Sequence, residues 1–421
     1  MAILSLGRRA FLRTTVAGAA VAAFPLPLGA QPKSVKIGAV HPVTGALAEI
    51  GQACRLGAQM AADAVNAAGG ITSLGGARLE LVPGDTENKP DVARAEAERV
   101  ISAGAQLLVG AFHSAQTAAM VPVAQQKRVP FLIDISAADP ITANVADSVK
   151  KGEQKVQYVY RNFPTSRVFG QRAAQFMAEI FKEAGVQPKR VVLIYTNDLF
   201  GQTQARQFQA AVKERNPGFE IVEAIPYPEA ATDLATEVSK LKSLRPDVIA
   251  PVTRATTAIL LLQELAKQRV EALGIVSPGT PGLYEAGQIA QLKELVEYVM
   301  DSVPWPNFKN PRTQKVAEEY VKRSGGKTFD TNSGYSYEAI LVLADVLERA
   351  KSTEPEAVVD ALKKTSIKNP LMVAAGPLTF NETGDNPNAS PAMIQILGQK
   401  PVVVWPRDAA AQKLVFPRPK R

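Results

Sequence analysis

The chain has 421 residues, of which 46% are hydrophobic and 21% are charged. This length is too great for one ordinary core and predicts two lobes, and the composition excludes disordered and collagen-like chains. The formal net charge is +8, but the basic residues are scattered and no RNA-binding aromatic motif accompanies them. We therefore expect a solvated basic surface and no nucleic-acid partner.

The N-terminus has the features of an export signal. A basic segment, residues 7–13 (GRRAFLR), precedes an apolar run from Thr14 to Phe24, and Leu28-Gly29-Ala30 resembles a cleavage site. The run is shorter than the roughly 20 residues that span a bilayer. Paired arginines are typical of a twin-arginine signal, with an ordinary secretory signal or an uncleaved start as alternatives. We expect residues 1–30 to be removed near Ala30 and the mature protein to be soluble and periplasmic.

Strand and helix patterns alternate along the first part of the mature chain. Strands are predicted at residues 35–40, 78–83, 106–109 and 129–133, with helices at 49–68, 91–103 and 114–127. The third strand is continuously apolar, which indicates burial on both faces, as in a parallel sheet covered by helices. Short connections and right-handed crossovers then predict a doubly wound α/β domain.

The alternation restarts after a stretch at residues 139–155 that we interpret as irregular. Strands are predicted at residues 191–195, 219–225, 248–251 and 273–276, with helices at 200–215, 233–243 and 255–267. Two further helices, residues 313–324 and 333–350, lack strands for a sheet of their own and are assigned to the first lobe. Residues 376–405 are predicted to form short strands and turns.

The motifs of common enzymes are missing from the sequence. The chain has two histidines, His41 and His113, and one cysteine, Cys54, and it contains no HExxH, CxxC, Walker A or G-x-S-x-G pattern. A lone cysteine in an apolar helical pattern is typical of packing and cannot form an intrachain disulfide. We therefore expect no enzyme activity, no metal and no cofactor.

Several segments, in the order in which they occur, resemble the periplasmic leucine/isoleucine/valine-binding proteins. These segments are Ile37-Gly38 with Pro42-Val43-Thr44-Gly45 and Gly51, residues 66–71 (NAAGGI), Asp198-x-Phe200-Gly201, and residues 376–380 (GPLTF) with Gly384-Asp385. The resemblance covers nearly the whole mature chain. It implies two Rossmann-like, doubly wound lobes joined by a three-strand hinge, the type I periplasmic binding fold.

The resemblance also implies domain limits and partners. The first lobe would hold residues 31–161 and 299–366, and the second 162–298 and 367–421. The protein would be a monomer that captures a small carboxylate ligand between the lobes and delivers it to an ABC permease in the inner membrane. A ligand-sensing module for a membrane receptor is the alternative function.

One candidate binding segment follows the strand at residues 106–109. Ser114 is predicted to cap the next helix, whose free N–H groups at residues 115–117 would bind an anion. The resemblance assigns Ser114 to the ligand carboxylate; helix capping alone is the alternative role. Phe112 is a candidate wall of the cleft, and His113 belongs to the same segment.

The loop after the next strand, residues 134–140, resembles the second loop that holds the ligand head group. Ser136 is expected to contribute its backbone or hydroxyl, with Ala137 and Ala138 close by; an ordinary turn hydroxyl is the alternative for Ser136. Relatives usually carry a threonine at the position of Ala138, so that one hydroxyl is missing here.

The remaining candidates define the walls and the ligand. Phe200 is expected to cover the apolar part of the ligand, with a core role as the alternative, and Ile50 matches a wall position. Gly279 stands where amino-acid binders place the acid that pairs with the ammonium group, and no acid follows until Glu285. Arg254 is expected to grip a carboxylate, with a solvent-facing role as the alternative. These features favour an aromatic or keto acid over leucine, because a buried ammonium group without a partner is costly.

Overall fold

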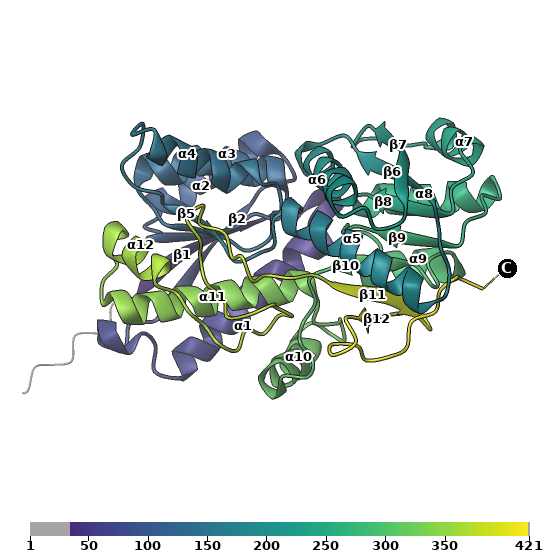
Figure 1. Ribbon diagram of the computed structural model, residues 1–421. Helices are drawn as coiled ribbons and strands as arrows, with labels where there is room; N and C mark the ends of the chain where they lie inside the picture. The colour runs from purple at the N-terminus through teal and green to yellow at the C-terminus, as the bar shows by residue number, and fades with distance from the viewer. Residues whose placement is uncertain (1–33, 420–421) are drawn as a thin grey trace, which may run out of the picture.

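The computed structural model describes residues 34–419 and shows two α/β lobes side by side (Figure 1). The predicted export signal, residues 1–30, lies outside the described residues. Within residues 34–419 no helix is long and apolar enough to cross a membrane. The two sheets agree with the two α/β lobes that the sequence predicts.

The first lobe is built on a parallel sheet of order β2-β1-β3-β4-β5. Its strands are β1 (Val35–His41), β2 (Leu79–Asp85), β3 (Leu107–Gly110), β4 (Phe131–Ile133) and β5 (Val159–Arg161). Successive side chains of these buried strands point to opposite faces of the sheet. Ile37 and Val109 therefore pack into the core on one face, while Val40 and Leu108 pack into a second core on the other.

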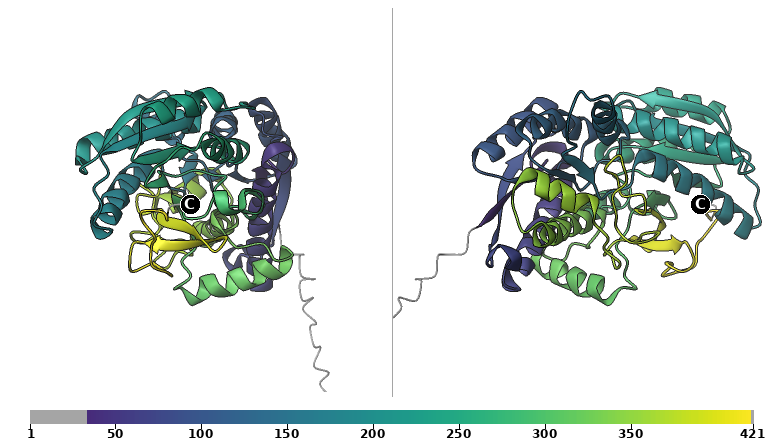
Figure 2. Two further views of the ribbon diagram at one scale, coloured as in Figure 1. Left: turned by 90° about the vertical axis from the view of Figure 1, so that its right-hand side faces the viewer. Right: turned by 60° about the vertical axis from the view of Figure 1, so that its left-hand side comes forward.

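Helices cover both faces of this sheet. One face carries α1 (Ala48–Ala67), α10 (Pro311–Arg323), α11 (Thr331–Ala350) and α12 (Pro355–Lys363), and the other carries α2 (Pro90–Ser102), α3 (Ser114–Lys127) and α4 (Pro140–Lys150). The late helices thus join the first lobe, as the right panel of Figure 2 shows for α11 and α12. The segment predicted as irregular contains α4, because Pro140 suits a first helical turn and Ile141 and Val145 are buried on one side.

The second lobe contains a seven-stranded sheet of order β12-β11-β10-β9-β8-β6-β7. Its strands are β6 (Arg190–Thr196), β7 (Glu220–Tyr227), β8 (Val248–Val252), β9 (Gly274–Ser277), β10 (Met300–Val303), β11 (Ala392–Leu397) and β12 (Lys400–Trp405). Its helices are α5 (Ser166–Glu183), α6 (Leu199–Arg215), α7 (Ala235–Ser243), α8 (Ala255–Lys267) and α9 (Ala286–Leu292). The sheet is parallel from β10 to β7, whereas β11 and β12 pair antiparallel at its edge.

The chain passes between the lobes at residues 162–165, 304–310 and 364–391. The domain limits from the sequence place residue 299 onward in the first lobe, but β10 pairs with β9 and therefore lies in the second sheet. The third passage is long, and Leu378 and Phe380 pack into the core of the first lobe before the chain reaches β11.

Candidate functional site

A small chamber lies between the lobes, and five of its fifteen lining residues are aromatic. Its volume is about 40 Å³. The lining residues are Phe112, Ile135, Ser136, Ala137, Phe163, Phe169, Phe200, Arg254, Gly279, Thr280, Pro281, Tyr284, Val303, Pro304 and Thr331. We call this the aromatic chamber. Six of the ten residues selected from the sequence line it: Phe112, Ser136, Ala137, Phe200, Arg254 and Gly279.

The chamber lies at the carboxyl ends of the strands of both sheets. In the first lobe Phe112 follows β3, Ile135 follows β4 and Phe163 follows β5. In the second lobe Phe200 lies in the first turn of α6, and Arg254 lies two residues after β8 and directly before α8. Open α/β sheets bind ligands in this position, because the loops after parallel strands meet at one edge of each sheet.

The turn that carries Phe112 has a strained backbone. Phe112 has a φ of 80°, a left-handed conformation that non-glycine residues adopt rarely. Gly110 has a φ of 144°, and a Cβ atom there would lie 2.1 Å from the carbonyl oxygen of Val40. Such strain persists only where the surrounding structure fixes it, and it gathers at ligand-binding sites.

Helix α3 begins differently from the sequence prediction. His113, not Ser114, is the N-cap residue, and its Nδ1 accepts a hydrogen bond from the N–H of Ala115 at 3.2 Å. The N–H of Thr117 donates to the carbonyl oxygen of His113. The predicted role of Ser114 as the cap is therefore wrong, and two of the three N–H groups expected to bind an anion already have acceptors.

Ser114 lies behind the chamber wall. It is buried, and its hydroxyl oxygen accepts a hydrogen bond from the hydroxyl of Ser136 at 3.3 Å. Ser136 lines the chamber, whereas Ser114 does not. Of the two serines, Ser136 is therefore the one at the chamber.

A buried arginine fixes the loop that carries Ser136. Nη1 of Arg161 donates to the carbonyl oxygens of Ser136, at 2.8 Å, and Ala138, at 3.0 Å, and its Nε donates to Asp385 at 2.8 Å. Ala138 is fully buried and does not line the chamber. Its contribution is the carbonyl oxygen that Arg161 holds. Sequence reasoning did not select Arg161, although an arginine at the end of a buried strand is an unusual feature.

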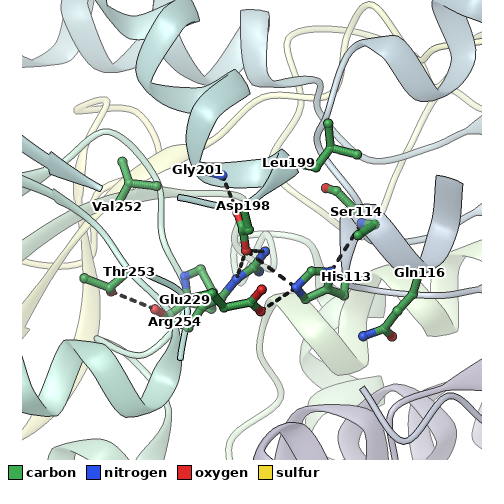
Figure 3. Close-up of polar contacts among 12 residues, drawn as sticks. His113, Ser114, Gln116, Asp198, Leu199, Gly201, Glu229, Val252, Thr253 and Arg254 are labelled. Atoms are coloured by element: carbon green, nitrogen blue, oxygen red, sulfur yellow. Dashed lines mark hydrogen bonds and ion pairs between the residues drawn. The ribbon is translucent and has the colours of Figure 1, made fainter. Parts of the chain in front are cut away.

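Arg254 reaches the chamber as part of an ion-pair network. Its Nε and Nη2 donate to Oδ2 of Asp198 at 2.8 and 2.5 Å (Figure 3). The guanidinium carbon lies 4.7 Å from the centroid of the Phe200 ring. Among residues 34–419, Nη1 of Arg254 has no hydrogen-bond acceptor. Arg254 is buried, so the solvent-facing alternative for it is excluded.

Asp198 links this network to helix α6. Its Oδ1 accepts a hydrogen bond from the N–H of Gly201 at 2.7 Å and so caps the helix. Burial raises the pKa of the Asp198 carboxyl, but Arg254, His113 and the N–H of Gly201 outweigh burial and hold the pKa well below its ordinary value. Asp198 therefore remains ionised throughout the neutral range.

His113 connects the network to the first lobe. Its Nε2 lies 2.9 Å from Oε1 of Glu229 and 3.5 Å from Oδ2 of Asp198, both in the second lobe (Figure 3). The hydrogen bond from His113 lowers the pKa of the Glu229 carboxyl. This contact joins the first turn of α3 to the loop after β7, and it therefore depends on the distance between the lobes.

His113, Asp198 and Glu229 present atoms that all lie within 4.8 Å of one another, a spacing that a metal ion could use. Two features oppose a metal here. Because Nδ1 of His113 accepts a hydrogen bond, the neutral ring carries its proton on Nε2, the atom that would face the metal. Asp198 is also paired with Arg254. The geometry favours an ion-pair network.

Gly279, the position where the resemblance implies an acid in amino-acid binders, borders the chamber. Its φ is 121°, and a Cβ atom there would lie 2.5 Å from Cδ1 of Phe169. The lining residues include one charged side chain, the cation Arg254, and no carboxylate. The aromatic chamber is therefore suited to an anionic, apolar occupant.

Ile50, the remaining candidate, lies elsewhere. It lines a second and larger interlobe chamber of about 390 Å³, which also contains Glu285, Trp305 and Asn332. Tyr284 lines both chambers. Its ring packs edge-on against Trp305, with ring centroids 5.6 Å apart.

Several chamber residues were missed by sequence reasoning. Phe163 and Phe169 belong to the first passage between the lobes and the start of α5, Val303 ends β10, and Pro304 follows it. Neither α5 nor β10 was predicted, so nothing placed these residues at a strand end. The aromatic residues shortly after position 161 were the available signal.

Comparison with known proteins agrees with this architecture. Residues 34–399 match the family model described as periplasmic binding protein. The chain belongs to the periplasmic binding protein family, and the resemblance to its leucine/isoleucine/valine-binding members is confirmed.

Individual relatives are distant but cover nearly the whole chain. Leu/Ile/Val-binding protein homolog 8 of Brucella abortus is 25% identical over 390 residues, 91% of this chain and 93% of that protein. The leucine-binding protein LivK of Thermotoga maritima has a TM-score of 0.73 at 22% identity, covering 88% of this chain and 97% of that one. A solute-binding protein of R. palustris, in complex with benzoate, has a TM-score of 0.72 at 18% identity, covering 90% and 100%.

Proposed function

We propose that this protein is the extracytoplasmic solute-binding subunit of an ABC importer and that its ligand is a small aromatic carboxylate. One observation carries the choice of ligand: the aromatic chamber combines five aromatic rings with a single guanidinium group and no carboxylate. The function requires capture and release and no covalent chemistry.

The apolar walls favour a ring over an aliphatic chain. Phe112, Phe163, Phe169, Phe200 and Tyr284 come from both lobes and line the same cavity. Aromatic pairs gain about 0.5–1.5 kcal/mol beyond the area that they bury. A planar ligand between these rings would form aromatic contacts with both lobes at once. The free energy of these contacts would therefore favour closure of the lobes.

The polar groups favour a carboxylate over an α-amino acid. Nη1 of Arg254 is a donor at the chamber, and the hydroxyl of Ser136 becomes a second donor when it turns from Ser114 to the ligand. Charge-assisted hydrogen bonds to a carboxylate are roughly twice as strong as neutral ones. An α-ammonium group would face Gly279 in place of an acid. Burying it without a partner costs several kcal/mol.

The size of the chamber implies a hinge motion. Its 40 Å³ is far below the roughly 150 Å³ of an engineered protein cavity that holds benzene. A ring-sized ligand therefore enters only when the lobes separate or the aromatic walls move. Three passages of chain between the lobes provide a hinge for such a motion.

The family supports the wider setting of this proposal. Members of the periplasmic binding protein family supply the expectation of export, of a permease partner and of a monomeric subunit. The same fold holds benzoate in one solved relative, 3,4-dihydroxybenzoic acid in another and isoleucine in a third. Both ligand classes are therefore compatible with the fold, and the chamber residues support the choice of an aromatic acid.

A thermal-shift comparison tests the ligand class. Mature protein is heated with benzoate, phenylacetate, leucine or isoleucine at increasing concentrations. A ligand present at 100 times its Kd adds about 2.7 kcal/mol of stability. We expect concentration-dependent shifts with the aromatic acids and none with the amino acids. Shifts with leucine and none with any aromatic acid would contradict the proposal.

A further inference from the structure

The second interlobe chamber borders the aromatic chamber at Tyr284, and we propose that it is the second half of one elongated binding site. In this proposal the ligand is an aromatic acid with an amine at its far end, and Glu285 and Asn332 accept hydrogen bonds from that amine. The inference rests on the proposed function and specifies the ligand further.

The second chamber is large enough for a substituent of several atoms. It measures about 390 Å³, against roughly 150 Å³ for a cavity that binds benzene. Ile50, Ile289, Trp305 and Tyr320 form buried parts of its wall, whereas Lys327 and Lys400 lie on the solvent side. The chamber therefore has a buried wall of mixed apolar and polar side chains and one side that faces solvent.

Glu285 places an unused acceptor in this wall. The residue is 4% exposed; its Oε2 accepts a hydrogen bond from the N–H of Gly282 at 2.8 Å, and its Oε1 has no partner. Glu285 precedes α9 but makes no capping hydrogen bond to it. A buried carboxylate oxygen without a donor is costly, and an occupant that donates a hydrogen bond removes that cost.

Asn332 provides a second unused acceptor from the other lobe. It is 1% exposed, and its Oδ1 has no hydrogen-bond partner. The orientation of its amide is set by the Nδ2 donor, which lies 3.5 Å from Oδ2 of Asp330. The two unpartnered atoms thus come from opposite lobes, and both accept hydrogen bonds once Glu285 is ionised. An amine, which offers several donors, matches them better than another acid would.

The charges around the chamber leave Glu285 as the carboxylate available to an amine. The Glu49 carboxylate lies 3.6 Å from Nζ of Lys327, and the Asp330 side chain accepts hydrogen bonds from the N–H groups of Asn332 and Ser333. Lys400 stands on the open side, away from the buried wall. An ammonium group at Glu285 would complete an ion pair in a buried position.

Proton exchange gives this arrangement a specific signature. Burial raises the pKa of Glu285 to about 8, so that most of the carboxyl is protonated at pH 7. A bound ammonium group favours the ionised form. Binding of the amine should therefore release close to one proton, roughly 0.9 at pH 7, whereas a neutral substituent should release none.

The test compares two acids of matched size, 4-(2-aminoethyl)benzoate and 4-propylbenzoate, with benzoate as the reference. Titration calorimetry in buffers of different ionisation enthalpy gives the Kd and the number of protons released. We expect the amine to bind wild-type protein at least tenfold more tightly than the propyl compound and to release a proton. The propyl compound should show no proton release.

Two variants test whether Glu285 and Asn332 cause the preference for the amine and the proton release. Glu285→Gln should lower the preference for the amine about tenfold and abolish the proton release, and Asn332→Ala should reduce the preference by a smaller factor. Glu318→Gln, on the exposed surface of α10, is the matched control and should change neither quantity. The wild-type ligand comparison needs no variant and remains decisive if Glu285→Gln does not fold.

The outcomes separate this inference from the proposed function. Benzoate binding with equal affinities for the two extended acids, and no proton release, would overturn the elongated site and leave the aromatic-acid ligand in place. Failure of all three acids to bind would contradict the proposed function and this inference together.

Discussion

His113 and Glu229 form a direct contact between the lobes, with Nε2 of the histidine 2.9 Å from Oε1 of the glutamate. The two residues are 116 positions apart and belong to separate sheets. Because separation of the lobes would break this contact, its free energy contributes to the closed arrangement. Glu229 is more than a third exposed, so that solvent weakens the contact.

Replacement of Glu229 by glutamine should weaken ligand binding modestly. An exposed ion pair contributes about 0.2–1 kcal/mol, which corresponds to a rise in Kd of up to about fivefold. A double-mutant cycle of His113→Gln and Glu229→Gln gives the interaction energy between these two residues. Titration of benzoate measures Kd, and Glu220→Gln, at the exposed start of β7, is the control. Additive effects of the two substitutions would show that the contact does not stabilise closure.

Removal of Arg254 should destabilise the folded protein through Asp198. In Arg254→Met the buried Asp198 carboxylate loses its closest cation, and breaking a buried pair in this way costs about 3–5 kcal/mol. Asp198→Asn in the Arg254→Met background should recover much of the loss, because asparagine still caps α6 without a charge. Urea unfolding measures the free energy of unfolding of the single and the double variant. Equal stability of the single and double variants would contradict this account.

Ser136→Ala should weaken the binding of carboxylates more than Ser114→Ala does. A hydrogen bond to a charged group contributes about 1.5–3 kcal/mol, so that loss of the Ser136 hydroxyl should raise the Kd for benzoate roughly ten- to hundredfold. Ser114 contacts Ser136 and does not line the chamber. Calorimetry measures the Kd of each variant. A larger rise in Kd for Ser114→Ala than for Ser136→Ala would show that the carboxylate binds at the start of α3.

Gly279→Ala should lower both stability and ligand affinity. The new Cβ atom would meet the Phe169 ring, and the left-handed φ adds backbone strain of about 1–3 kcal/mol. Gly218→Ala is the matched control, because Gly218 also has a positive φ, 89°, but has open space around it. Affinity for benzoate should fall for Gly279→Ala alone. Equal affinity of the two variants would show that Phe169 does not shape the ligand site.

Stability should decrease as the pH rises between about 5 and 8. Burial raises the pKa of Glu285 from 4.5 to about 8, so the folded state holds more protons than the unfolded state in this window. Each unit of pH increase then lowers the free energy of unfolding by up to about 1.4 kcal/mol through the deprotonation of this group. Glu285→Gln should flatten the dependence of Tm on pH, and Glu318→Gln should not. An unchanged slope in Glu285→Gln would show that the group is ionised in the folded state.

The order of elements could be predicted from local patterns. Apolar strand segments such as Val191–Leu193 and helix signals such as Gly69-Gly70 depend on residues that are neighbours in sequence, and both sheets contain the predicted strands. Helices α4 and α5 were missed. In α4 only four of eleven residues are buried, and polar residues lie between them, so that its helical pattern is weak.

The candidate site could be predicted only in part. Positions at strand ends, such as Phe112, Ser136 and Arg254, line the chamber because parallel strands bring their carboxyl ends to one edge. The alternation of elements therefore reveals which loops face the cleft. It does not reveal which side chain in a loop reaches the cavity, because that depends on backbone turns such as the one that makes His113 the cap of α3.

The sequence by itself determined two α/β lobes, the strand ends that face each other and the absence of an acid at Gly279. Tertiary structure decided that Arg254 is paired with Asp198, that Tyr284 lies between two chambers and that His113 meets Glu229. The reason is physical: periodicity reports contacts between near neighbours in the chain. Contacts across the cleft depend on how the whole chain, after three passages between the lobes, places two separate sheets against each other.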